Sequence, residues 1–124
     1  MLRISKLTDY GTMILVHLAV HQGRLNSASD VATGTRLALP TVQKLLKLLA
    51  RSDLVRSVRG AEGGYVLART PATISAADIL DVLEGPLSIT ECSTSESRCE
   101  LEDGCPVGGA WQKINRGIRG ALGE

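Results

Sequence analysis

The sequence predicts a mainly α-helical fold that carries one small β-hairpin. Apolar residues recur at helical spacing in several segments, and serine–aspartate caps or glycine stops bound these segments. The stretch LVRSVRGAEGGYVLA (residues 54–68) instead has two short β-prone pieces around a glycine-rich centre. The 124-residue chain has room for one core and is too short for two independent domains. Because it contains no phenylalanine, that core is expected to be aliphatic.

The first helix is predicted over residues 8–22, with Gly23 as its C-terminal stop. The apolar residues that indicate this helix are Met13, Ile14, Leu18 and Ala19. Ser27 and Asp30 stand at capping-box spacing, so a short second helix is expected to open there. It is expected to break around Gly34.

A third helix is predicted from Pro40, which suits a first helical turn, to about Ser52. Its two faces differ in character at 100° per residue. The apolar face holds Val42, Leu45, Leu46 and Leu49, and the opposite face holds Gln43, Lys44, Lys47 and Arg51. This helix is therefore expected to be apolar inside and basic outside.

The second half of the chain begins with a predicted hairpin, whose strands lie around Val55–Val58 and Tyr65–Ala68. A fourth helix is expected from the capping pair Ser75 and Asp78 to Gly85. Residues 85–109 show no periodicity, which is typical of a functional or disordered loop. A last amphipathic helix is predicted over Ala110–Leu122, with Trp111, Ile114, Ile118 and Leu122 on one stripe.

The charges of the chain are divided unevenly. Residues 1–70 hold ten Lys and Arg against four Asp and Glu, whereas residues 71–124 hold four against nine. A basic front half and an acidic rear half indicate two separate tasks.

Several classes of function are disfavoured. The longest apolar run, residues 13–20, is interrupted by His17 and is shorter than the ~20 residues that span a bilayer. An odd number of cysteines is untypical of a secreted disulfide framework, so a cytoplasmic location is expected. The sequence has no set of nucleophile, base and orienting group, and no phosphate-binding loop, so no enzyme activity is expected.

The second and third helices, joined by a tight turn and followed by a glycine-tipped hairpin, form the pattern of a winged helix-turn-helix. In such a module the third helix enters the major groove of DNA. Base-edge or phosphate contacts are expected from Thr41, Gln43 and Lys44, phosphate contacts from Lys47 and Arg51, and a minor-groove contact from Arg59. The alternative is that Lys44, Lys47 and Arg51 only solvate an exposed face.

All three cysteines, Cys92, Cys99 and Cys105, fall in one acidic, serine-rich stretch, ECSTSESRCELEDGCP. On spacing alone they could bind an iron–sulfur cluster, bind zinc or be plain thiols. Structural zinc prefers a close cysteine pair, which is absent, and clusters are normally held by four ligands. So polar a segment buries little apolar surface, and a metal cluster would supply the missing cross-links.

The stretch SVRGAEGGYVL (residues 57–67) resembles the wing signature of the iron–sulfur-sensing winged-helix regulators, which include the IscR and NsrR types. Four further stretches resemble most the regulators of the SUF iron–sulfur assembly operon: LPTVQKLLKLLA (39–50), SITEC (88–92), CELEDGC (99–105) and WQKIN (111–115). The resemblance covers nearly the whole chain. It implies a homodimeric transcription repressor that binds a double-stranded DNA operator.

The resemblance also implies a division of the chain. Residues 1–88 would form the winged helix-turn-helix DNA-binding domain, residues 89–109 the cluster loop and residues 110–124 the dimerisation helix. The final helix of the family usually continues further, so a truncated dimerisation helix is expected. Loading or loss of the cluster would change how the two subunits hold DNA, with either form as the tighter binder.

The cofactor implied by the resemblance is a 2Fe–2S or 4Fe–4S cluster on Cys92, Cys99 and Cys105. Asp9 is the implied fourth ligand, because LTDYG (residues 7–11) aligns with the helix from which the NsrR type supplies an aspartate to the partner subunit. The alternative for Asp9 is a first-turn carboxylate favoured by the helix dipole. The IscR type has a histidine where Gly108 stands here, so a histidine-ligated cluster is not implied.

Two rival functions remain open at this point. An iron–sulfur electron-transfer or assembly protein would bind a cluster without binding DNA, against which the basic third helix argues. A cluster-free winged-helix regulator would bind DNA regardless of its cysteines.

Overall fold

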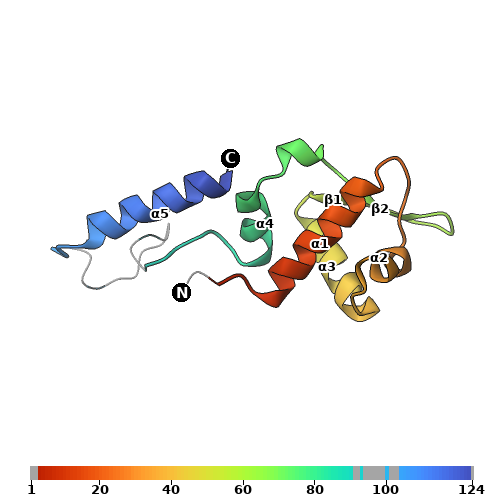
Figure 1. Ribbon diagram of the computed structural model, residues 1–124, viewed down its shortest axis with the longest axis horizontal. Helices are drawn as coiled ribbons and strands as arrows, with labels where there is room; N and C mark the ends of the chain where they lie inside the picture. Colours follow the sequence, from red (N-terminus) through yellow and green to blue (C-terminus); the bar gives the residue numbers. More distant parts are fainter. Residues whose placement is uncertain (1–2, 91–92, 94–99, 101–103, 124) are drawn as a thin grey trace. The chain divides into compact units, whose positions relative to one another are not determined.

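The computed structural model describes residues 3–90, 93, 100 and 104–123. Its contacts form two compact units, Ile4–Ile74 and the chain from Ser75 onward, each of which is described by itself. Helices and one antiparallel hairpin make up the described chain, which confirms the predicted fold class (Figure 1). No helix in the described ranges is long and apolar enough to cross a membrane.

The elements follow the predicted order. The first unit contains α1 (Lys6–Val20), α2 (Ala28–Thr35), α3 (Leu39–Arg51), β1 (Val55–Val58), β2 (Gly64–Leu67) and a 3₁₀ turn, η1 (Pro71–Thr73). The second contains α4 (Ala76–Leu83) and α5 (Gly108–Gly123). The predicted division of the chain at residues 88 and 109 stays a prediction. The boundary between the two compact units is a different one, between Ile74 and Ser75.

Helix α1 begins two residues earlier than predicted. Ser5 is its N-cap and accepts a hydrogen bond from the Thr8 backbone N–H at 3.2 Å. Ile14 and Leu18 lie in the core as expected, but Met13 is 38% exposed. Met13 neighbours Ile14 in the sequence, but 100° of helical rotation separates the two side chains.

The capping box of α2 is present as predicted. The Ser27 hydroxyl accepts from the Asp30 N–H, and Asp30 Oδ2 accepts from the Ser27 N–H at 3.1 Å. These hydrogen bonds, the backbone one first, lower the pKa of the Asp30 carboxyl below its ordinary value of 3.8. The break predicted around Gly34 is confirmed, since the helix ends with Thr35 and its C-cap Arg36 is left-handed (φ 62°).

Gly34 also serves the packing of α2 against α1. A Cβ at this position would lie 2.2 Å from Cε1 of His17. The His17 ring occupies that space, stacks on His21 with 4.2 Å between ring centroids, and has no hydrogen-bond partner for Nε2 among the described residues. Burial, followed by the charges of His21 and Arg24, lowers the pKa of His17 from its ordinary 6.5, and Asp30 opposes this shift.

Acidification is therefore expected to destabilise the first unit through His17. Since the pKa of His17 is lower in the folded chain, the unfolded chain binds more protons below about pH 6.5, and the unfolding free energy falls as pH drops. Urea titrations at about pH 7.5 and about pH 5 should show a smaller loss for His17→Gln than for the unchanged protein. Equal losses would contradict this role of His17.

Helix α3 forms the centre of the core, and its predicted apolar face is confirmed. The side chains with 0% exposure on this face are Val42, Leu45, Leu46 and Leu49. Helices α1 and α2 and strand β1 pack against α3 and contribute the buried residues Ile14, Leu18, Val31 and Val55, and Leu54 just before β1 is also buried. This core is aliphatic, as expected, and it holds the polar face of α3 outward.

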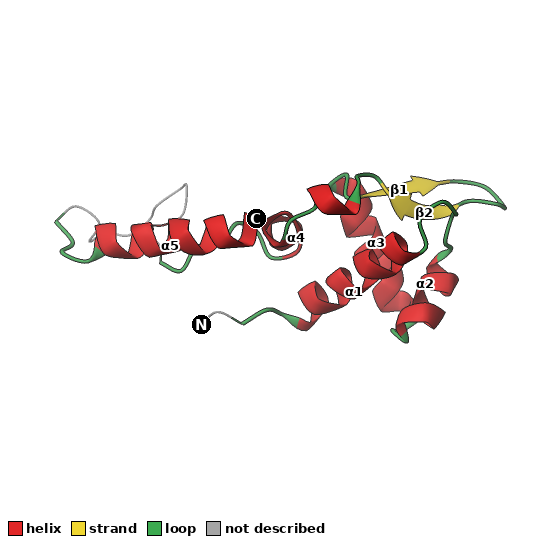
Figure 2. Cartoon of the chain, turned by 45° about the horizontal axis from the view of Figure 1, so that its top comes forward, coloured by secondary structure: helices red, strands yellow, loops and turns green. Residues whose placement is uncertain are grey.

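The hairpin pairs β1 with β2 from Val55↔Leu67 to Val58↔Gly64 and extends away from the helices of its unit (Figure 2). Tyr65 also exchanges both backbone hydrogen bonds with Asn26, at 3.1 and 2.7 Å, in the connection between α1 and α2. This contact depends on Gly64, because a Cβ there would lie 2.7 Å from the Asn26 carbonyl oxygen. The strand is thereby bonded to the helices by its backbone.

In the second unit, the predicted capping box of Ser75 and Asp78 opens α4. Helix α5 begins at Gly108 rather than Ala110 and packs against α4. Both oxygens of Asp81 accept hydrogen bonds from the two terminal guanidinium nitrogens of Arg119, at 2.6 and 2.5 Å. This ion pair joins the two helices of the unit.

Candidate DNA-binding surface and cysteine segment

The outer face of α3 carries the residues expected to contact DNA. Gln43, Lys44, Lys47 and Arg51 are exposed, and Thr41 near the start of the helix is half-buried. Leu45, Leu46 and Leu49 fix the rotation of the helix, so these polar side chains share the side away from the core. The arrangement presents amide, hydroxyl and cationic groups along one exposed stripe. Which of them contact DNA stays a prediction.

The hairpin tip forms a closed turn. The Gly63 N–H donates to the Gly60 carbonyl oxygen at 3.0 Å, and Gly60 takes up a positive φ of 114°. Gly63 is required for close packing, because a Cβ there would lie 2.1 Å from the Val58 carbonyl oxygen. The exposed Arg59 precedes this turn, as predicted for a wing residue.

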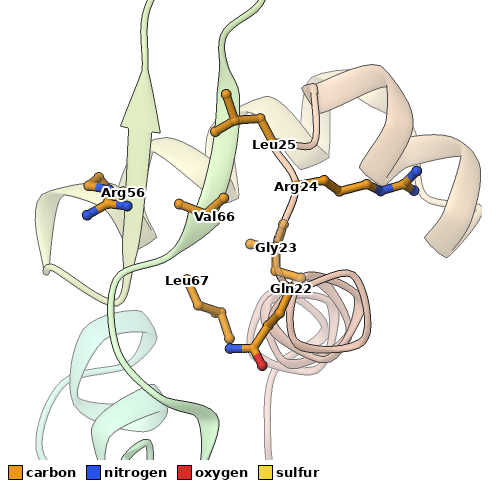
Figure 3. A pocket seen from close by; sticks show the side chains of 8 residues that line it. Gln22, Gly23, Arg24, Leu25, Arg56, Val66 and Leu67 are labelled. Atoms are coloured by element: carbon orange, nitrogen blue, oxygen red, sulfur yellow. The ribbon is translucent and has the colours of Figure 1, made fainter.

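A pocket of about 390 Å³ beside the hairpin involves two arginines that the sequence analysis did not single out. Its walls come from the end of α1, the turn that follows, and the hairpin (Figure 3). The lining residues are Leu18, Gln22, Gly23, Arg24, Leu25, Arg56, Val66 and Leu67. Figure 3 shows Arg24 extending away from the strands, whereas Arg56 stands on β1 beside Val66, its partner in the register. Strand alternation after the buried Val55 would have identified Arg56 as outward-facing.

We call residues 91–105 the cysteine segment. Of its three thiols, only Cys105 belongs to the described residues, and Cys92 and Cys99 lie outside them. Cys105 is half-buried and free, just before α5. Its side chain faces buried Gly108, where a Cβ would lie 3.8 Å from the Cys105 sulfur.

Asp9 lies exposed in the first turn of α1, and its backbone N–H donates to the Ser5 carbonyl oxygen at 3.1 Å. It belongs to the first unit and Cys105 to the second, so the structure describes no site that contains both. Among the described residues, no three His, Cys, Asp or Glu side chains come together as a metal site. The ligand roles of Asp9 and the cysteines stay predictions.

The donor chemistry around Cys105 fits an iron–sulfur cluster. Thiolate is the usual cluster ligand. Cys105 is only half-buried, and its sulfur faces Gly108, a residue without a side chain. Among the described residues, the chain therefore supplies one partly accessible thiol of the type that clusters use.

Comparison with known proteins assigns the chain to a family. Residues 4–124 match the model of the Rrf2 family, described as iron-dependent transcriptional regulators. The chain belongs to the Rrf2 family. It is a transcriptional regulator with a winged-helix DNA-binding fold, and its relatives are regulators rather than enzymes.

Three matches show how close this relationship is. The HTH-type transcriptional regulator CymR of Bacillus subtilis is 37% identical over 98% of this chain and 83% of its own length. A solved structure of CymR, called the global cysteine regulator of B. subtilis, has a TM-score of 0.74 at 34% identity, covering 98% of this chain and 90% of that one. IscR of T. potens has a TM-score of 0.69 at 33% identity, covering 98% and 80%. This Rrf2 protein thus resembles both an IscR and a cysteine regulator.

Proposed function

We propose that this Rrf2 protein is a repressor of iron–sulfur assembly (SUF) genes whose binding to its DNA operator is gated by an iron–sulfur cluster. The observation that carries the proposal is the combination, in one short chain, of an exposed cationic recognition helix and a segment that holds every cysteine. The two features occupy different units, as expected for a reader of DNA joined to a sensor.

The DNA-binding part is assigned to α3 and the hairpin tip. Gln43 can make the two-pronged amide contact with adenine, and Lys44 can donate to guanine N7 or O6. Lys47 and Arg51 lie further along the helix, where phosphate neutralisation supplies affinity without sequence information. Arg59 at the tip is placed for the minor groove, whose negative potential attracts arginine.

Substitutions at Gln43 and Lys47 should have different effects on DNA binding. Measured against duplexes selected from a random library, Gln43→Ala should lose about 1–3 kcal/mol of discrimination at one base pair. Lys47→Ala should weaken all duplexes alike and reduce the slope of log affinity against log salt by about 1. Lys6→Ala, an equal charge change on α1, is the control and should leave the slope unchanged. Identical behaviour of the Gln43 and Lys47 variants would contradict the assignment.

The cluster is assigned to the thiolates of Cys92, Cys99 and Cys105, with Asp9 of a partner subunit as the candidate fourth ligand. A bound cluster would cross-link the cysteine segment and would be labile to oxidants, because an oxygen ligand suits iron–sulfur sites less well than sulfur. The family description as iron-dependent regulators supports this assignment. Either a 2Fe–2S or a 4Fe–4S cluster is compatible with it.

The homodimer is assigned to α5. Trp111 and Ile114 are 44% and 47% exposed and lie on one stripe with the half-buried Ile118 and Leu122. An aromatic and aliphatic stripe on an outward helix face is typical of a protein interface. Two copies of the chain would bury this stripe against each other and present two recognition helices to one operator, as helix-turn-helix dimers do.

The proposal is tested by anaerobic purification, followed by an absorption spectrum and by iron and sulfide counts. The protein is then mixed with a DNA fragment from upstream of SUF genes, and the electrophoretic mobility of that DNA is measured before and after the protein is exposed to air. We expect coloured protein, and a change in DNA affinity when the colour is lost. Colourless protein, or a DNA affinity that does not change when the colour is lost, would overturn the gating by a cluster. The assignment of the DNA-binding surface would remain intact.

A second candidate, a cluster-free regulator, is favoured by the 37% identity with CymR, which is called the global cysteine regulator of B. subtilis. In this case the thiols would not hold iron, and Cys99→Ala would leave DNA affinity unaltered. The electron-transfer alternative has no such support, since the matched family consists of transcriptional regulators.

A further inference from the structure

Asn115, in the middle of α5, is a buried polar residue that binds the backbone leading to the cysteine segment. The residue as a whole is 7% exposed. Its Oδ1 accepts from the Ile89 N–H at 2.9 Å, and its Nδ2 donates to the Leu87 carbonyl oxygen at 3.2 Å. An N–H and a carbonyl two residues apart are the groups an extended chain offers to a neighbouring strand. One amide side chain therefore holds residues 87–89 on the helix.

The chain turns immediately after this attachment. The Ser93 N–H donates to the Thr90 carbonyl oxygen at 3.1 Å, and the hydroxyls of these two residues are 2.7 Å apart. The Ser88 hydroxyl donates to the same carbonyl at 2.7 Å. In the sequence, Thr90 and Ser93 flank Cys92. Thr90 and Ser93 are thus joined by hydrogen bonds close in the sequence to the Asn115 attachment.

The other end of the cysteine segment also meets α5. Cys105 lies against Gly108 in the first turn of the helix. Gly108 and Asn115 are both buried and stand seven residues apart, which places them on the same face with an axial separation of about 10 Å. The residues just before the segment and Cys105 at its end therefore contact one side of one helix.

The apolar stripe assigned to dimerisation is adjacent to this side. Asn115 directly follows Ile114 and stands one helical turn from Trp111 and Ile118, the spacing at which helical side chains are neighbours. A displacement of residues 87–89 would therefore move the part of α5 that lies beside its apolar stripe.

We propose that Asn115 is the positioning residue that couples the state of the cysteine segment to α5. This inference rests on the proposed function, because it supplies the route by which cluster loading would affect the dimer. It further predicts that the coupling depends on the two hydrogen bonds of Asn115 and not on the cluster. Other changes to the thiols of the segment should be transmitted in the same way.

The experiment measures amide hydrogen exchange in the full chain, with and without a cluster reconstituted from ferrous iron and sulfide. In the unchanged protein, loading should slow exchange at residues 87–89 and along α5 together. In Asn115→Ala, iron and sulfide should still bind, but the slowing along α5 should disappear. Asn115→Asp, which keeps the acceptor for Ile89 and loses the donor for Leu87, should retain part of the slowing of exchange along α5. The exposed Lys113→Ala on the same helix is the matched control and should behave as the unchanged protein.

Two readouts separate this inference from the proposed function. The ratio of DNA dissociation constants for the loaded and cluster-free forms should move toward 1 in Asn115→Ala, whereas a purely structural residue would lower both affinities and leave the ratio unchanged. An unchanged ratio and unchanged slowing along α5 would overturn the coupling.

If the unchanged protein takes up no iron and sulfide, the cluster proposal fails, and alkylation of the thiols with iodoacetamide replaces loading. Alkylation should then alter exchange along α5 in the unchanged protein but not in Asn115→Ala. An equal change in both proteins, or no change in either, would overturn the coupling.

Discussion

Gly63→Ala is expected to disable the hairpin tip and to weaken DNA binding by about tenfold or more, which corresponds to about 1.4 kcal/mol of lost contact energy. The added Cβ would lie 2.1 Å from the Val58 carbonyl oxygen, and backbone on both sides of the turn would have to move. Forcing extra atoms into a closely packed place costs about 1–3 kcal/mol of folding stability. Affinity for selected duplexes and urea unfolding measure the two effects.

The control for this substitution is Ala61→Ser, which changes an exposed residue of the same turn without such an approach. It should leave both measurements close to those of the unchanged protein. If Gly63→Ala kept full DNA affinity while the unit remained folded, the hairpin would not be part of the DNA-binding surface. Loss of affinity with unchanged stability would instead indicate that the tip contacts DNA without strain on the fold.

Cys105→Ala is expected to abolish cluster binding in the anaerobically reconstituted protein. Three thiolates are already fewer than the four ligands that clusters normally use, so a chain with two of them should hold little iron. Even residues that only support a metal ligand change metal affinity about 10–100-fold, and the loss of a ligand should exceed the lower end of that range. Iron and sulfide counts and the visible spectrum measure this effect.

The matched control is Val107→Ala, two residues away and 51% exposed, which should retain the colour of the unchanged protein. Both variants should keep their helical circular dichroism, because Cys105 is only half-buried. Full iron content in Cys105→Ala would remove this thiol from the ligand set. The DNA-binding assignment of α3 would be unaffected, since it depends on a different unit.

The elements predicted well are those with local causes. The capping boxes at Ser27 and Ser75 use residues three positions apart, and the apolar face of α3 repeats with the helical period, so both can be recognised in a short window of sequence. The hairpin likewise follows from β-prone residues around glycines. The winged-helix fold class could be predicted because these local signals agree with one another.

The features that were missed depend on contacts between distant residues. Gly34 was correctly expected near the end of a helix, but its role where α2 approaches the His17 ring of α1 was not recognised. The two hydrogen bonds of Asn115 reach partners 26 and 28 positions away, so no sequence window contains them. The ligand set of a cluster in the cysteine segment is similarly difficult to predict. It depends on whether three thiols that are separate in the sequence come together in space.

The backbone bridge between Asn26 and Tyr65 has a consequence for how target sites can diverge. Because it ties the strand leading from the tip to the connection between α1 and α2, the wing should keep a fixed orientation relative to α3. Exchanges of the charged tip residues Arg59 and Glu62 among relatives should then alter which flanking bases are preferred. The distance between groove contacts within one half-site would stay constant throughout such exchanges.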